Sequence, residues 1–289
     1  MIWRQSMEKV EKSGRSIGKR IHRYLFDGGI SRQATRDTVS HLAENLPGTV
    51  VFGGMVRDLG LASARTFNSD IDLVSLANRA EILAAIRHYN PVVNKFGGFR
   101  FVAGKQMFDI WSFEDTWAFK QGLVAPKTLQ DLCLTTFFNL DGAFHPLKSN
   151  EVYGTSDFIA SLHGRILDIN LQENPSPQNM AARAINLAIS RDLAISLRLL
   201  NFVLSNAASA LWRDGPSRVF LELAKKYCEG QSDAPFRFAP QASFDIAQPL
   251  DSEKNYPTCA QQVTVETSSW PRYHHPNATY DFENNSAFA

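Results

Sequence analysis

Cysteine is scarce in this 289-residue sequence, which contains only Cys133, Cys228 and Cys259. The three residues are odd in number and widely separated, and no C-x-x-C pair occurs. The sequence therefore predicts neither a disulfide scaffold nor a cysteine zinc site. Cysteines used in this way suit a reducing compartment, so we expect a cytoplasmic protein.

Long apolar runs are also missing. No stretch approaches the roughly 20 apolar residues that span a bilayer, so we expect no membrane association. The N-terminal segment lacks the apolar core of a secretory signal, and Glu8 and Glu11 argue against an organellar transit peptide.

An excess of charge of one sign is absent as well. Thirty basic and 29 acidic residues give a formal net charge of +1, which provides no global attraction to nucleic acid. Basic residues do gather in a predicted N-terminal arm, residues 1–30. Two interpretations are open: a solvated helix or frayed arm, or an arm that binds an anionic partner. The basic residues of the arm are Arg4, Lys9, Lys12, Arg15, Lys19, Arg20 and Arg23.

The apolar content is normal for a globular protein: 44% of the residues are hydrophobic. Apolar periodicity and turn residues predict an alternation of helices and strands between residues 31 and 113. The α+β order indicates a small mixed sheet with helices on one face. The expected elements are helix 31–48 with Val39, Leu42 and Leu46 inward, strand 49–52, helix 55–61, strand 70–76, helix 78–89 with Ile82, Leu83 and Ile86 inward, and a hairpin of strands 96–104 and 106–113.

Beyond residue 160 the pattern becomes helical. Ser176-Pro177 has the form of a helix start, with an N-cap residue followed by proline. From about residue 230 the composition turns to Ser, Pro, Gln, Asn and Thr, which is typical of a poorly ordered tail. We therefore expect a head domain over 31–160, an all-helical lobe over 161–230 and a low-order tail over 231–289.

Three aspartates in the predicted strands suggest chemistry. Side chains two residues apart on a strand share a face, so Asp70 and Asp72 project together. Carboxylates held that close repel each other unless a cation neutralises them, and Mg²⁺ prefers oxygen ligands. Asp109 adds a charged residue to an otherwise apolar strand, where a metal partner would offset the cost of burial. The sequence predicts a two-metal site.

A glycine pair precedes these aspartates. Gly53 and Gly54 lack Cβ atoms, so their backbone could approach a triphosphate, and the following helix begins with free N–H groups. Arg57, in the first turn of that helix, could bind the same phosphates. Each feature alone has a plain structural explanation: a turn, a polar strand start or a satisfied aspartate. The charges at Lys95, Arg100 and Lys105 are consistent with solvated strand ends or with phosphate contacts.

The motif GGMVRD…SDIDLVS resembles the head-domain signature of the DNA polymerase beta-like nucleotidyltransferases, in particular the poly(A) polymerase and CCA-adding enzyme branch. Its pattern is approximately GGxVRDxLLGRxxxDxDL, and the resemblance covers roughly residues 35–200. It implies metal binding by Asp70, Asp72 and Asp109.

The same resemblance implies nucleotide binding by a further set of residues. TLQDLCLTTFFNLDGAF is similar to the segment RRDFTxNA of that branch, which points to Asn139, and Arg183 corresponds to its arginine-rich helix. The implied nucleotide-binding residues are Gly53, Gly54, Arg57, Asn139 and Arg183.

The sequence also departs from that branch. Residues 55–69 form a loop about three residues longer than the family pattern, and the RRDFT residues are replaced around Leu134-Thr135-Thr136. An EDxxR motif, with which CCA-adding enzymes choose C or A, is absent, and the helical region that grips tRNA is short. Metal-dependent nucleotidyl transfer is therefore expected, and CCA addition is not.

The resulting hypothesis is transfer of an NMP from an NTP to a hydroxyl, with release of pyrophosphate. ATP is the favoured nucleotide, and two Mg²⁺ ions are the favoured cofactors, for which Mn²⁺ could substitute. The favoured acceptor is the 3′ end of an RNA, with tRNA as the first candidate. One alternative keeps the chemistry with a protein, small-molecule or nucleotide acceptor, as in a toxin or defence system. Another is a non-catalytic nucleotide-binding relative, against which the three retained carboxylates argue.

Overall fold

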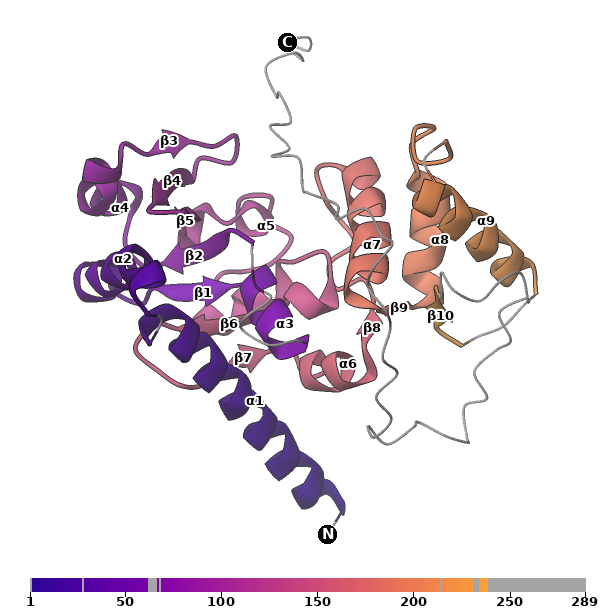
Figure 1. Ribbon diagram of the computed structural model, residues 1–289, viewed down its shortest axis with the longest axis horizontal. Helices are drawn as coiled ribbons and strands as arrows, with labels where there is room; N and C mark the ends of the chain where they lie inside the picture. The colour runs from indigo at the N-terminus through magenta and orange to yellow at the C-terminus, as the bar shows by residue number, and fades with distance from the viewer. Residues whose placement is uncertain are drawn as a thin grey trace. The chain divides into compact units, whose positions relative to one another are not determined.

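The computed structural model contains a seven-stranded mixed sheet with the strand order β3-β4-β5-β2-β1-β6-β7 (Figure 1). The structure describes residues 2–27, 29–61, 67, 69–213, 215–230 and 234–238. Only β2 and β5 pair in parallel within this sheet. The strands are β1 (Val50–Phe52), β2 (Ile71–Ser75), β3 (Val92–Val93), β4 (Phe99–Ala103), β5 (Gln106–Ser112), β6 (Ala143–Pro146) and β7 (Tyr153–Gly154).

Helices flank the sheet and follow it along the chain. In the described part of the chain, no helix is long and apolar enough to cross a membrane. The α-helices are α1 (Ile2–Phe26), α2 (Gln33–Asn45), α3 (Gly54–Leu61), α4 (Arg79–Ile86), α5 (Trp117–Lys120), α6 (Phe158–Gly164), α7 (Pro177–Arg191), α8 (Leu197–Asn206) and α9 (Gly215–Glu229). The 3₁₀ helices are η1 (Ile30–Arg32), η3 (Arg87–Tyr89), η4 (Phe113–Asp115), η5 (Leu129–Leu134) and η6 (Asn139–Asp141).

The alternation of side chains along β2 separates the core from the polar face. Ile71 and Leu73 are buried in the main hydrophobic core with the helices, whereas Val74 belongs to a smaller cluster on the other face. Because side chains alternate along a strand, Asp72 shares the face of Val74. The predicted α+β class, with a mixed sheet and its helices, is confirmed.

The inward residues of the predicted helices are mostly confirmed. Val39 and Leu42 of α2 are fully buried. In α4, Ile82 and Ile86 are buried, but Leu83 is 43% exposed, so its predicted inward position is wrong. Residues four apart lie one above the other on a helix, while the next residue points about 100° away. Leu83 therefore falls outside the narrow face of this short helix.

The segment predicted as an N-terminal arm forms the long helix α1. Its C-terminal half packs into the main core through Ile17, Ile21 and Leu25, each at most 1% exposed. At Gly18 the helix approaches the carbonyl of Asn150 so closely that a Cβ atom would overlap it. This part of the predicted arm is therefore integral to the fold.

The predicted helical lobe contains α7, α8 and α9, of which α7 packs against the other two. A three-stranded sheet that the periodicity did not predict joins β8 (Ile166–Leu167) and β9 (Ala194–Ile195) of this lobe to β10 (Phe236–Arg237), which lies in the segment predicted as a low-order tail. One hydrophobic core runs from α1 to β10. The domain boundary predicted at residue 160 stays a prediction. Of the predicted tail, 231–233 and 239–289 lie outside the described residues.

Candidate active site

Strand register brings the three predicted carboxylates to one face of the sheet. In the parallel pair of β2 and β5, Asp72 lies directly opposite Asp109. Asp70 precedes Asp72 by two residues and therefore lies on the same face, one pleat away. The structure thus brings together three aspartates that are up to 39 positions apart in the sequence.

The glycine pair lies at the same end of the sheet. β1 runs antiparallel to β2, with Val51 opposite Leu73, so the end of β1 is beside the start of β2. Gly53 follows β1 with a φ of +68°, in the left-handed region that favours glycine, and its N–H donates to Ala143 at 3.0 Å. Gly54 is the first residue of α3. The turn and the carboxylates are therefore neighbours.

The three carboxylates concentrate negative charge at one place in the fold. Burial, together with the charges of Asp109, Asp70 and Asp141, raises the pKa of Asp72 to about 7, although Arg183 acts in the opposite direction. Burial also raises the pKa of Asp70. A divalent cation held by these oxygens would remove the repulsion, which makes the donor set suitable for Mg²⁺.

Arg100 takes the place of a cation at two of these carboxylates. It lies opposite Asp109 across the hairpin of β4 and β5. Its Nε donates to Asp109 Oδ1 at 3.0 Å and its Nη2 to Asp109 Oδ2 at 2.6 Å, while Nη2 is 3.6 Å from Asp70 Oδ2. In this arrangement no three acidic, histidine or cysteine side chains of the described residues are placed to hold a metal ion. The oxygens fit Mg²⁺ in chemistry, but those of Asp109 and Asp70 are paired with Arg100 in this structure.

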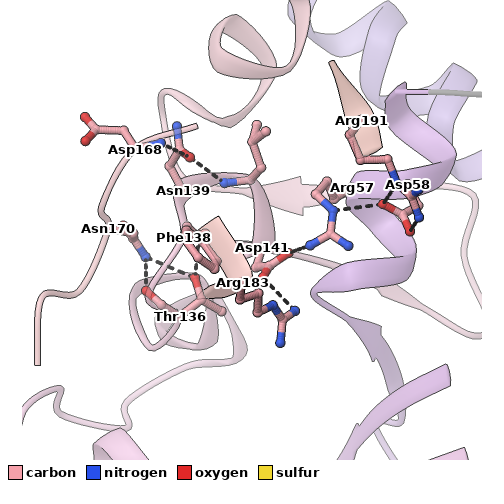
Figure 2. Close-up of polar contacts among 11 residues, drawn as sticks. Arg57, Asp58, Thr136, Phe138, Asn139, Asp141, Asp168, Asn170, Arg183 and Arg191 are labelled. Carbon is pink, nitrogen blue, oxygen red and sulfur yellow. Dashed lines mark hydrogen bonds and ion pairs between the residues drawn. The ribbon is translucent and has the colours of Figure 1, made fainter. Parts of the chain in front are cut away.

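Arg57 lies inside the protein, with a 5% exposed side chain. Its Nε donates to Asp58 Oδ1 at 2.8 Å and its Nη1 to Asp141 (Figure 2). Burial lowers the pKa of Arg57, but the charges of Asp141 and Asp58 outweigh this effect and raise it. Its Nη2 lies 3.4 Å from the position that a Cβ on Gly54 would take. The predicted phosphate contact of Arg57 stays a prediction, and Nη2 is the atom available for it.

The ion pairs of Arg57 continue into the helical lobe. Arg191 of α7 donates to both oxygens of Asp58, with its Nη2 at 3.0 Å from Oδ2. Arg183, also on α7, donates to Asp141 Oδ2 at 3.3 Å (Figure 2). Burial raises the pKa of Asp58, and hydrogen bonds and charge from Arg191 and Arg57 lower it overall. These ion pairs connect α7 to α3 through buried carboxylates and partly exposed arginines, and Arg183 lies close enough to act on the pKa of Asp72.

Asn139 connects η6 to the start of the helical lobe. Its Oδ1 accepts hydrogen bonds from the backbone N–H groups of Leu140 and Asp168, each at 2.9 Å, and its Nδ2 donates to the carbonyl of Ile166 at 3.2 Å. Figure 2 shows this side chain among backbone groups. The contacts are structural, and the predicted nucleotide-binding role of Asn139 stays a prediction.

The sequence reasoning did not name Asp141, and it left Arg100 open as a solvated strand-end charge or a phosphate contact, whereas Arg100 pairs with Asp109. Asp141 lies in the apolar segment FFNLDGAF, the same signal that singled out Asp109. Arg100 could have been found from the hairpin: a two-residue turn at Gly104-Lys105 places Ala103 opposite Gln106 and hence Arg100 opposite Asp109. Neither signal was specific enough to indicate an ion pair.

The solved structures similar to this chain include CCA-adding enzymes and tRNA nucleotidyltransferases. A CCA-adding enzyme in complex with ATP shares 20% identity at a TM-score of 0.44, over 59% of this chain and 40% of its own. A tRNA nucleotidyltransferase with a primer tRNA and an incoming ATP analogue shares 18% sequence identity at a TM-score of 0.47. The match covers 66% of this chain and 60% of that structure. The Thermotoga maritima CCA-adding enzyme with tRNA shares 20% sequence identity at a TM-score of 0.45. The match covers 68% of this chain and 49% of that structure.

The chain thus spans between about two fifths and three fifths of the length of these structures. No model of a known protein family and no curated protein sequence matches it. The names of these structures are those of the enzyme branch whose signature the GGMVRD…SDIDLVS motif resembles, and their TM-scores lie below 0.5.

Proposed function

We propose that this protein is a nucleotidyltransferase that moves an NMP from an NTP to a hydroxyl acceptor and releases pyrophosphate. The observation that carries the proposal is the convergence of Asp70, Asp72 and Asp109 beside the Gly53-Gly54 turn. Carboxylates that repel one another, next to a glycine turn at the start of a helix, suit a substrate that brings both phosphate and cations.

Each residue has a role in this proposal. Asp70 and Asp72 would hold two Mg²⁺ ions, with Asp109 completing the set; the ions would neutralise charge on the phosphates and on the attacking oxygen. The N–H groups at the glycine turn and Nη2 of Arg57 would orient the triphosphate. Arg183, which already faces Asp141 and Asp72, would approach it from α7.

The bond changes follow from this arrangement. The oxygen of the acceptor hydroxyl attacks the α-phosphorus, and the bond from that phosphorus to the bridging oxygen of pyrophosphate breaks. Asp109, which lies across from Asp72 on the neighbouring strand, would help to hold a metal ion that favours release of the hydroxyl proton to solvent. The ion pairs of Asp58 with Arg57 and Arg191 connect α3 to α7 beside this site.

The first acceptor that we propose is the 3′ end of an RNA, with tRNA as the leading candidate. ATP is the first nucleotide to test. This choice rests on the sequence resemblance and on the basic residues of positions 1–25. Without the EDxxR motif, the addition of a defined CCA end is not part of the proposal.

The test is transfer of label from each α-labelled NTP to total RNA in the presence of Mg²⁺. We predict that Asp72→Asn lowers the rate at least 100-fold, since the cluster loses a cation ligand. Asp37→Asn, a matched loss of one charge on the exposed face of α2, keeps the wild-type rate. Absence of transfer to any RNA by the wild-type protein would contradict the RNA acceptor.

A second acceptor class is favoured by the absence of the EDxxR motif with which CCA-adding enzymes choose C or A. A protein, small molecule or nucleotide would need no tRNA-gripping region, as in a toxin or defence system. The same labelled NTPs, added to lysate fractions of protein and of small molecules, distinguish this class from RNA. A non-catalytic relative would give no transfer anywhere, and failure of Mg²⁺-NTP to raise the melting temperature would contradict nucleotide binding itself.

A further inference from the structure

Arg100 is the cation that the carboxylate cluster holds within this chain. It binds both oxygens of Asp109 through Nε and Nη2, and the same Nη2 faces Asp70. Its side chain is 47% exposed, whereas that of Asp109 is 9% exposed. The guanidinium thus lies over the buried carboxylate from the solvent side.

A divalent cation would need the oxygens that Arg100 now binds. Hard cations require direct oxygen ligands, and a carboxylate already shared with a charged guanidinium is a weaker ligand because part of its charge is neutralised. The two positive partners therefore compete for Asp109 and Asp70. At most one of them can occupy the space between these side chains.

The surroundings allow Arg100 to move. Its neighbour across β3 and β4 is Val92, which is exposed. Among the described residues, Arg100 forms ion pairs with Asp109 and Asp70. Arg57 is the contrasting case, since it is buried and bonded to two aspartates. Of these two arginines, Arg100 is the one that can be displaced without opening the core.

We propose that Arg100 is an exchangeable counter-ion, bound to Asp109 and Asp70 in the nucleotide-free protein and displaced when the metal ions arrive with the NTP. The inference rests on the proposed function, because it takes these carboxylates as the metal ligands. The site would therefore bind a free metal ion weakly and would accept the metal ion as part of a metal–nucleotide complex. The displaced guanidinium then lies beside the anionic substrate, where its charge is again paired.

Binding of Mn²⁺ alone, followed by electron paramagnetic resonance, tests the inference without any turnover. Arg100→Met removes the competing charge while keeping most of the apolar stem. We expect it to bind Mn²⁺ about tenfold more tightly than wild type, the effect of one charge-assisted contact. Arg218→Met is the matched control: this arginine pairs with Glu222 on the exposed face of α9, and its loss leaves the affinity unchanged. A non-hydrolysable NTP should reduce the difference between Arg100→Met and wild type.

A double-mutant cycle with Asp109→Asn shows whether the arginine acts through that carboxylate. In the Asp109→Asn background, Arg100→Met should change Mn²⁺ affinity less than in the wild-type background. Arg100→Gln serves as a second variant if Arg100→Met does not fold, as judged by circular dichroism. Normal Mn²⁺ binding with equal or weaker affinity in the folded Arg100 variants would overturn this inference alone. Absence of Mn²⁺ binding by every variant, with and without nucleotide, would overturn the proposed function as well.

Discussion

Acidification from pH 7 to pH 4 should destabilise the protein through His145. This histidine of β6 is 0% exposed, and its Nδ1 lies 2.9 Å from the carbonyl of Glu151. Its Nε2 is buried and lacks a hydrogen-bond partner among the described residues. Burial lowers the pKa of His145 from 6.5 to about 4, and the neighbouring His22 acts in the same direction. The folded protein therefore holds this imidazole neutral.

The sign and the size of this change in the free energy of unfolding follow from proton linkage. Between pH 6.5 and pH 4 the unfolded chain binds a proton at His145 and the folded chain does not, so the free energy of unfolding falls as the pH falls. This contribution is complete above pH 6.5 and lost by about pH 4. One pKa unit corresponds to 1.36 kcal/mol, so the loss is about 3 kcal/mol. That is a large part of the roughly 5–15 kcal/mol that stabilises a typical domain.

Urea unfolding, followed by circular dichroism at several pH values between 7 and 4, provides the measurement. His145→Asn keeps a donor for the Glu151 carbonyl but does not titrate, so its stability should fall by about 3 kcal/mol less than that of wild type over this range. His163→Asn, at an exposed position of α6, should follow the wild-type pH dependence. A constant stability difference between His145→Asn and wild type from pH 7 to pH 4 would refute the reasoning.

Two further predictions concern buried contacts. Arg57→Met leaves Asp58 and Asp141 each without one cationic partner, and removing one member of a buried pair typically costs about 3–5 kcal/mol. Urea unfolding should show that loss of stability. The control Arg218→Met, which removes an exposed ion pair, should change the free energy of unfolding by less than about 1 kcal/mol. Equal effects of both substitutions would contradict the role of burial. Gly18→Ala places a methyl group against a backbone carbonyl in the turn before β7 and should lower stability by at least about 2 kcal/mol. A wild-type melting temperature for Gly18→Ala would show that α1 does not pack as closely as described.

Much of the site could be predicted from local sequence. The two-residue period of a strand placed Asp70 and Asp72 on one face, and the apolar run around Asp109 marked it as unusual. The left-handed backbone at Gly53 is a property of glycine itself. These conclusions need only a few neighbouring residues, and the strand pairing of Asp72 with Asp109 agrees with them.

Other features depend on partners that are distant in the sequence. The sequence predicted that Arg57 binds phosphate, but it did not indicate that this arginine pairs with Asp141, 84 positions away. Asp58 is paired with Arg191, 133 positions away, and no local pattern indicates that contact. The same limit applies to Asn139, whose amide is used by the backbone near residue 166.

The sequence by itself therefore determined which chemical groups this protein offers: three carboxylates, a glycine turn and basic residues at known spacings. Only the tertiary structure decided which charges neutralise one another. Local periodicity sets the direction of a side chain, because it follows from backbone geometry over a few residues. The partner of a charged group is set by the packing of whole elements, and that packing pairs Arg100 with the predicted metal ligands and Arg57 with the interior.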